Sequence, residues 1–215
     1  MSADVSHNPS PLERPDLRPY FVTVDDFDQP IHWEDYFENA NPVELDIGCG
    51  RGLFLVNAAA QNPDTNFLGM ELDYKEGRRS ARRLMKREFA NARVIGGDCR
   101  RLLQRFIFPA SVQAAHVYFP DPWWKRKHLR RRLFTDAFVE LLARVVRSGG
   151  IVHSWTDVEP YFGVISALMD AHADFRTLPP PAQRAPTHDL DYQTSFERKK
   201  RKLGSRIWRG MWQRG

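Results

Sequence analysis

The residues most suggestive of chemistry lie together between Val117 and Leu133. A short apolar run ends in a Pro-Asp-Pro turn around Asp121, which is followed by Trp123, Trp124 and a stretch rich in lysine and arginine. The turn is expected to fix the carboxylate of Asp121 at the end of a strand. Indole rings stack on nucleobases and cations bind phosphate, so this segment predicts a site where chemistry is done on a nucleic acid.

A glycine-rich turn occurs earlier in the chain. Segment 44–52 reads as a strand that runs into Gly-x-Gly-x-Gly and opens a helix, with Asp46 just before Gly48 and Gly50. Glycines allow positive φ angles and close approach of a ligand to the backbone. A carboxylate beside this loop repels the pyrophosphate of a dinucleotide but suits the ammonium and sulfonium groups of S-adenosylmethionine. The loop therefore predicts a binding site for that methyl donor.

Two further acids follow the next predicted strands. Glu71 lies nineteen residues after Gly52, at a strand end where a carboxylate can bind both ribose hydroxyls. Asp98 follows the third strand and is expected to bond the adenine amino group. Asp73 competes with Glu71 for the ribose, and Glu71 is preferred because it is closer to the strand end. Acids at successive strand ends favour the methyl donor over a plain glycine turn with solvated acids.

These residues require a scaffold in which several strand ends meet. Strands and helices alternate along the chain, which indicates βαβ units and an α/β fold with a mostly parallel, doubly wound sheet. Ligands of such sheets bind at the carboxyl ends of the strands. We expect strands at 43–47, 66–71, 92–95, 114–119 and 150–155, and helices at 53–61, 74–89, 129–146 and 158–171.

Composition bounds the domain organisation. The 215 residues, 42% of them apolar, suit one α/β domain. We expect a flexible arm at 1–40, a single domain at 41–215 with a basic carboxy-terminal tail, and an extended linker at 178–186. The two cysteines make no disulfide framework and no zinc-ligand spacing occurs, so no metal is predicted. No apolar stretch is long enough for a membrane span, which favours a cytoplasmic protein. The choice between monomer and homodimer stays open.

Basic residues gather in three places. The net charge is +5, and besides the run after Trp124 there are clusters in the predicted helix 74–89 and in the tail at 196–204. A charged helix face is commonly just solvated, but this one has almost no acid to pair its cations. RNA binding with a strong salt dependence is therefore expected.

Five motifs in order resemble a known family. They are Asp-Ile-Gly-Cys-Gly from Asp46, Gly-Met-Glu ending at Glu71, Phe-Pro-Asp-Pro-Trp around Asp121, Thr-Asp at Asp157, and Thr-Ser-Phe-Glu-Arg from Thr194. Together they resemble the bacterial tRNA (guanine-N7-)-methyltransferases over about 170 residues. The resemblance implies a Rossmann-like class I methyltransferase fold, S-adenosylmethionine as cofactor, and methylation of guanine 46 in the tRNA variable loop.

Roles follow from the resemblance position by position. The family's cofactor-contacting positions match Asp46, Glu71, Asp98 and Asp121, and Asp121 also matches the catalytic position. The substrate-contacting positions match Lys125, Asp157, Thr194, Ser195, Phe196 and Glu197.

The chain departs from the family pattern in three places. Asp46 stands where many members have Glu, Trp124 replaces a smaller or polar residue, and the first 40 residues lack an arginine-rich pattern. These differences bear on RNA affinity and tRNA choice more than on the reaction.

Methylation of guanine N7 needs no general base, because N7 has a lone pair and no proton. Asp121 is therefore expected to orient the guanine and to stabilise its developing positive charge. Lys125 is expected to bind a phosphate, and Trp123, Trp124 and Phe196 are each candidates for stacking or for packing. The alternatives are a non-catalytic RNA-binding protein on this scaffold, a nicotinamide oxidoreductase, and a methyltransferase for another nitrogen of nucleic acid or protein.

Overall fold

The computed structural model describes residues 16–123, 125–180 and 194–215. In this part of the chain a sheet of eight strands has the order β1-β4-β3-β2-β5-β6-β8-β7. The strands are β1 (Phe21–Thr23), β2 (Val43–Ile47), β3 (Asn66–Glu71), β4 (Ala92–Gly96), β5 (Val112–Tyr118), β6 (Val146–Thr156), β7 (Phe175–Leu178) and β8 (Trp208–Arg214).

The pairing is mostly parallel, as the sequence predicts. Strands β1 to β6 pair in parallel, and β8 runs antiparallel to both β6 and β7. The chain moves outward from β2 in both directions, so β2 and β5 are neighbours at the point where the strand order reverses. This switch point is where doubly wound sheets bind ligands.

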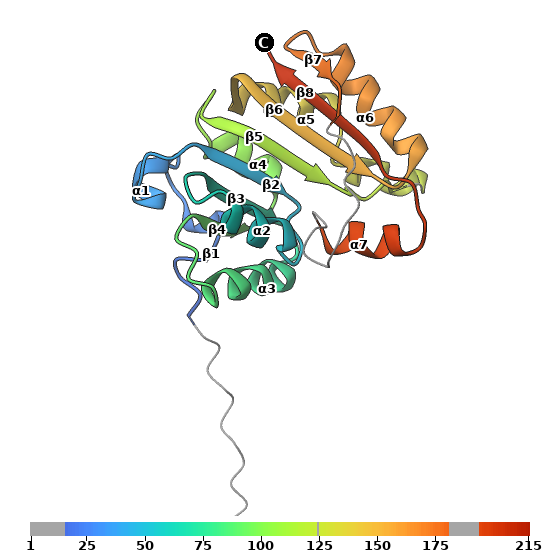
Figure 1. Ribbon diagram of the computed structural model, residues 1–215. Helices are drawn as coiled ribbons and strands as arrows, with labels where there is room; N and C mark the ends of the chain where they lie inside the picture. Colours follow the sequence, from blue (N-terminus) through green and yellow to red (C-terminus); the bar gives the residue numbers. More distant parts are fainter. Residues whose placement is uncertain (1–15, 124, 181–193) are drawn as a thin grey trace, which may run out of the picture.

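Helices cover both faces of the sheet (Figure 1). Helices α2 and α3 pack on β3 and β4, whereas α5 and α6 pack on β6 on the other face together with α4. Helix α7 lies beside the loops at one end of the strands (Figure 1). The helices are α1 (Trp33–Phe37), α2 (Leu53–Gln61), α3 (Tyr74–Met85), α4 (Cys99–Arg105), α5 (Asp136–Val145), α6 (Glu159–Ala171) and α7 (Ser195–Lys202), with 3-10 turns η1 (Val24–Asp26) and η2 (Arg126–Arg131).

The helix predicted at 129–146 is wrong at its start. Residues up to Arg131 belong to η2, and α5 begins only at Asp136. The reason is the N-cap residue Thr135, whose Oγ1 accepts a hydrogen bond from the Phe138 N–H at 3.3 Å. A threonine in extended conformation that satisfies a free amide starts a helix there.

The expectation of a flexible arm at 1–40 is wrong for residues 16–40, whereas residues 1–15 lie outside the described part. Strand β1 extends the sheet by pairing with β4, and Leu17, Val24 and Phe37 are each at most 3% exposed. Single apolar residues without periodicity carry this docking, so a search for amphipathic patterns does not detect it.

The basic tail is also more structured than expected. It forms α7 and then β8, which is inserted between β6 and β7 and buries Trp212 in the core. Most of the proposed linker at 178–186 lies outside the described residues.

Candidate functional site

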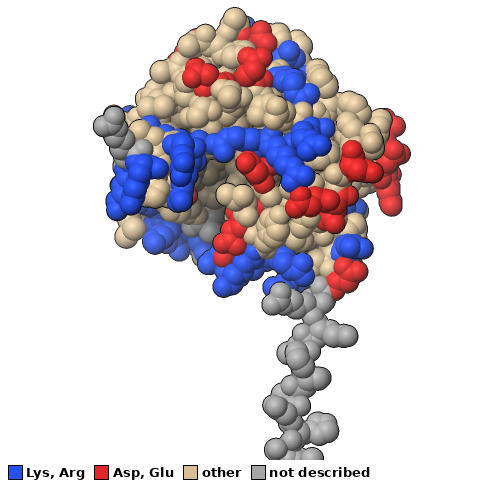
Figure 2. Space-filling model, turned by 180° about the vertical axis from the view of Figure 1, so that it is seen from behind, with Lys and Arg blue, Asp and Glu red and all other residues tan. Residues whose placement is uncertain are grey.

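A cavity of about 650 Å³ lies at the carboxyl ends of β2, β5 and β6. Its lining comes from the glycine loop, the turn after β5, the start of α6 and helix α7. Figure 2 shows Lys and Arg side chains gathered around a hollow on the face seen from behind. The predicted site residues that line the cavity are Asp46, Gly48, Gly50, Asp121, Asp157, Thr194 and Phe196.

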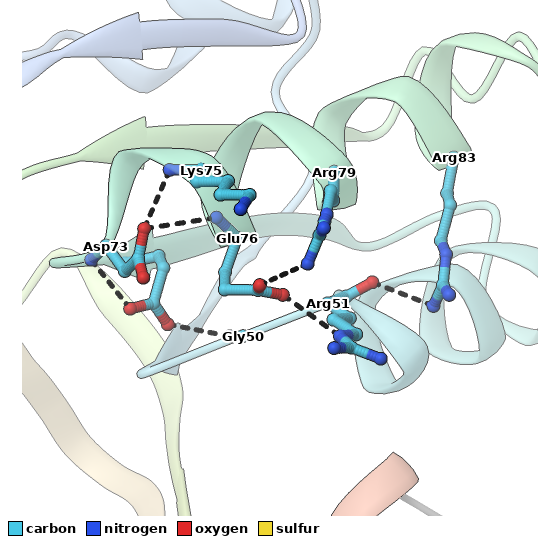
Figure 3. Close-up of polar contacts among 8 residues, drawn as sticks. Gly50, Arg51, Asp73, Lys75, Glu76, Arg79 and Arg83 are labelled. Carbon is cyan, nitrogen blue, oxygen red and sulfur yellow. Dashed lines mark hydrogen bonds and ion pairs between the residues drawn. The ribbon is translucent and has the colours of Figure 1, made fainter.

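The glycine-loop wall, residues 46–52, is fixed by backbone interactions. Gly48 and Gly50 have φ angles of 83° and 52°, and a Cβ atom on either would meet nothing within 4 Å. The Gly48 N–H donates to the carbonyl of Met70 at 2.8 Å, and the Gly50 N–H donates to Glu71 Oε2 at 2.8 Å. The glycines therefore leave open space beside a backbone that is held in place (Figure 3).

Asp46 is a buried carboxylate without a complete set of partners. It is 3% exposed, and its Oδ2 has no hydrogen-bond partner among the described atoms. Burial, and then the charge of Glu71, raises the pKa of Asp46 to about 8. A buried, unsatisfied carboxylate is costly to maintain. Its position on the cavity lining therefore suits a ligand with a positive charge.

The turn after β5 has an unusual backbone. Phe119 and Trp123 adopt φ angles of 53° and 40°, which cost about 1–3 kcal/mol each for residues other than glycine. The turn is held from outside, because the Phe119 N–H donates to the carbonyl of Trp155 at 2.7 Å and Arg132 Nε donates to that of Pro122 at 2.7 Å. Asp121, between the two residues with positive φ, is exposed and lines the cavity.

Helix α7 forms a second wall of the cavity, the α7 wall (residues 194–202). Thr194 caps the helix, since its Oγ1 accepts a hydrogen bond from the Glu197 N–H at 2.9 Å. Phe196 is 44% exposed and lies 5.1 Å from the ring of Phe119. Lys200 Nζ lies 2.7 Å from Asp157 Oδ2 and 5.1 Å from the centre of the Phe196 ring. The wall thus presents one aromatic face and one ion pair to the cavity.

Four predicted site residues do not line the cavity. Glu71 holds the glycine loop, and Asp98 is an exposed N-cap of α4 that accepts a hydrogen bond from the Arg100 N–H at 2.9 Å. Lys125 is exposed at the start of η2. Glu197 is buried. The side chains of Trp124 and Ser195 lie outside what the structure describes.

Glu197 is 2% exposed and serves helix α7 in this structure. Its Oε1 lies 3.3 Å from Arg201 Nη1 and 3.8 Å from Arg209 Nη2. The side chain that the sequence predicts to contact substrate is therefore engaged in anchoring α7 to β8. Trp123 likewise packs with Arg131 and His128, at 5.1 Å and 5.5 Å, and does not line the cavity.

Sequence reasoning missed a polar chain that ends at the cavity. Tyr118, a lining residue, has its hydroxyl 2.9 Å from His116 Nδ1, and His116 Nε2 lies 2.8 Å from Glu44 Oε2. The ring of His153 stacks on His116 at 5.0 Å, and burial lowers the pKa of His153 to about 3. The available signal was polar residues two apart in strands otherwise filled with apolar ones.

Within the described residues no group of three or more His, Cys, Asp or Glu is arranged to hold a metal ion. No helix there has the length and apolar character needed to cross a bilayer.

The sheet order and the ligand-sized cavity at its switch point define a Rossmann-like class I methyltransferase fold. Solved structures with this fold include a 30S ribosomal A1408 methyltransferase from an uncultured bacterium, with a TM-score of 0.60 and 16% identity, covering 84% of this chain and 91% of that one. A geranyl diphosphate methyltransferase in complex with GPP and sinefungin has a TM-score of 0.57 and 14% identity, covering 81% and 72%.

Sequence comparisons show the family. A model described as a putative methyltransferase matches residues 40–210. The tRNA (guanine-N(7)-)-methyltransferase of Rhodopirellula baltica is 38% identical over 90% of this chain and 74% of its own length. The enzyme of the same name from Sodalis glossinidius is 34% identical over 84% and 75%. The chain belongs to the family of bacterial tRNA (guanine-N7-)-methyltransferases.

Proposed function

We propose that this protein transfers a methyl group from S-adenosylmethionine to N7 of guanine 46 in the variable loop of tRNA. The observation that carries the proposal is one cavity in which a buried carboxylate with an unpartnered Oδ2, Asp46, and an exposed one, Asp121, lie on the same lining. Family membership supplies the tRNA and the guanine nitrogen, and position 46 comes from the resemblance in the motifs.

The residues of the glycine-loop wall fit the cofactor. S-adenosylmethionine supplies an electrophilic methyl group on a positively charged sulfur. The carboxylate of Asp46 can compensate the positive charge of the cofactor's ammonium and sulfonium groups. Gly48 and Gly50 leave room for the cofactor beside the backbone. Glu71 uses one oxygen for the Gly50 N–H and the other for the Asp73 N–H, at 2.8 Å and 2.9 Å. Each carboxylate oxygen accepts a second hydrogen bond, so Glu71 can position the loop and bind the ribose.

Asp98 is proposed to accept a hydrogen bond from the amino group of the adenine. It spends Oδ1 on capping α4 and remains exposed to a ligand at the end of β4.

On the substrate side, Asp121 is the proposed catalytic residue. Its carboxylate can accept hydrogen bonds from the N1–H and the N2 amino group of guanine and so fix the plane of the base. N7 gains positive character as it acquires the methyl group, and a nearby fixed negative charge stabilises that change. No proton has to be removed, so Asp121 acts by orientation and charge.

Asp157, Thr194 and Phe196 are proposed to complete the guanine site. Phe196 offers an exposed ring for stacking, worth about 1–3 kcal/mol per base. Asp157 is paired with Lys200, so a guanine amino group has to share or replace that ion pair. Lys125, outside the lining, is proposed to bind a phosphate, and Ser195 is proposed to contact the substrate. Glu197 supports this end of α7 through Arg201 and Arg209.

The test is methyl transfer from labelled donor to tRNA, followed by nucleoside analysis. We expect N7-methylguanosine with wild-type tRNA and none when guanine 46 is replaced by adenine. Asp121→Asn should lower kcat by about 10²–10³ because charge stabilisation is lost. Asp64→Asn, an exposed acid in the loop before β3, is the matched control.

Near-normal turnover by Asp121→Asn at saturating RNA contradicts the role of its charge. Methylation of tRNA that lacks guanine 46 contradicts the position, and tRNA binding without any product favours a non-catalytic RNA-binding protein.

A further inference from the structure

Three arginines form a cluster at the edge of the cavity on the glycine-loop side. Arg51 directly follows Gly50, and Arg79 and Arg83 lie on successive turns of α3 (Figure 3). We call Arg51, Arg79 and Arg83 the arginine cluster. Arg51 and Glu76 line the same cavity as Asp121, so a ligand on the cluster is adjacent to whatever enters the cavity.

The cluster is held together by specific contacts. Glu76 bridges two of its members, with Oε2 at 3.0 Å from Arg51 Nε and Oε1 in contact with Arg79 Nη1. Arg83 Nη1 donates to the backbone carbonyl of Arg51 at 2.9 Å. The guanidinium groups are therefore oriented by the protein and are not merely scattered over a solvated face.

The charges of the cluster are not balanced. The cluster has three guanidinium groups and one carboxylate, Glu76, which pairs with Arg51 and Arg79. Burial, followed by the fields of Arg51, Arg87 and Arg198, holds the pKa of Arg83 below its usual value. Arg198 belongs to α7, so positive charge reaches this spot from both walls of the cavity. Gathering like charges costs free energy, and an anion that binds between them recovers it.

The chemistry of the anion follows from the geometry. Guanidinium groups bind phosphate oxygens in pairs of parallel hydrogen bonds, and RNA phosphates recur along a strand. Arg79 and Arg83 are about 6 Å apart along the helix axis. Arg51, which lines the cavity, lies beside both of them (Figure 3). A single small carboxylate, such as that of the cofactor, needs only the lining residue Arg51.

We propose that the arginine cluster binds the RNA backbone phosphates next to the target guanosine; this rests on the proposed function. Lys125 lies after β5, at the other end of the loop that carries Asp121. Phosphate contacts near both loops hold the strand on two sides while the base is turned into the cavity.

The experiment measures tRNA binding without cofactor, at several salt concentrations, for wild type, Arg79→Gln, Arg83→Gln and the double variant. Each single change is expected to weaken binding about tenfold at low salt and to reduce the slope of log affinity against log salt by about 0.7–0.9. Arg79→Lys should restore the slope, because it restores the charge. Arg105→Gln, an exposed arginine at the far end of α4, is the matched control and should behave as wild type.

Unchanged affinity and slope in the double variant would overturn the proposal. Loss of S-adenosylmethionine affinity with unchanged tRNA binding would also overturn it and would assign the cluster to the cofactor carboxylate. Thermal melting of each variant shows whether the fold is intact, and Arg79→Lys keeps the test valid if a glutamine variant unfolds. Since binding is measured without methylation, a wrong reaction or target position leaves this result interpretable.

Discussion

The two walls of the cavity are built in different ways. The glycine-loop wall comes from one short stretch of chain, and backbone N–H groups and the carboxylate of Glu71 hold it. The α7 wall comes from residues 194–202, far along the chain, and ion pairs such as Lys200 with Asp157 hold it. The glycine-loop wall is thus fixed by hydrogen bonds to its backbone, whereas the α7 wall depends on ion pairs, which salt and a polyanion can compete for.

The largest effect is expected from Gly52→Ala in the glycine-loop wall. Gly52 has a φ of 71°, and a Cβ there would lie 2.0 Å from Ser80 Oγ. Positive φ and overpacking together should lower the free energy of unfolding by about 2–4 kcal/mol. Urea denaturation measures it.

Gly163→Ala is the matched control for this change. Gly163 lies within α6, and a Cβ there meets nothing within 4 Å, so stability should stay the same or rise by up to about 1 kcal/mol. If both variants lost the same stability, the rigid geometry assigned to the glycine-loop wall would be wrong.

A second prediction concerns pH. The pKa of Asp46 rises from 3.8 to about 8 because of burial and then the charge of Glu71. Between these values the folded protein keeps a proton that the unfolded chain releases. The contribution of Asp46 to the free energy of unfolding is therefore fully present below pH 3.8 and is lost as the pH rises towards 8. Asp46→Asn should flatten this decline, which denaturation at a series of pH values measures.

The same group links pH to cofactor binding. A cationic cofactor selects the ionised carboxylate, so binding at pH 7 should release nearly one proton and strengthen as the pH approaches 8. Calorimetry in two buffers with different ionisation enthalpies counts that proton. Asp46→Asn should bind more weakly and release none, and an equal proton release in the variant would point to another group.

The smallest effect is expected from Lys200→Gln in the α7 wall. The ion pair with Asp157 is partly exposed, with 29% of the lysine side chain accessible, so its loss should cost at most about 1 kcal/mol. Hydrogen exchange of the α7 amides should increase, and wild-type exchange should approach that of the variant at high salt. The control is Lys199→Gln, one residue earlier and exposed. A loss as large as that of Gly52→Ala would abolish the contrast between the walls.

The sequence predicts the fold best where structure is local. Strands 43–47 and 66–71 and helix 53–61 have the predicted bounds, because apolar runs end there at glycine, acid or turn residues. Strands β1, β7 and β8 were missed, since each is short or basic and acquires its stability by pairing with a distant strand. The same holds for α1, whose burial depends on the core it joins.

The site follows the same rule. Asp46, Gly48, Gly50 and Asp121 lie on the cavity because strand ends in a parallel sheet meet at one edge. Phe196 and Glu197 stand side by side in one motif, yet one faces the cavity and the other is buried. Consecutive helical residues point about 100° apart, so a motif cannot give both side chains the same environment without the helix orientation. The arginine cluster could be identified only from the fold, because its members come from a loop and from a helix that are separate in the sequence.

The insertion of β8 between β6 and β7 has a consequence for biosynthesis. About 30 residues separate Leu178 at the end of β7 from Trp208 at the start of β8. At the rate of ribosomal synthesis, β8 follows β7 by about 2–6 s, and β8 is the only neighbour of β7 in the described sheet. The edge of β6 that pairs with β8 stays unpaired for longer. Exposed edges of this kind recruit other chains, so a nascent molecule is most prone to aggregation during that interval. Helix α7 emerges within the same gap, and the cavity gains its second wall only as the last pairing closes.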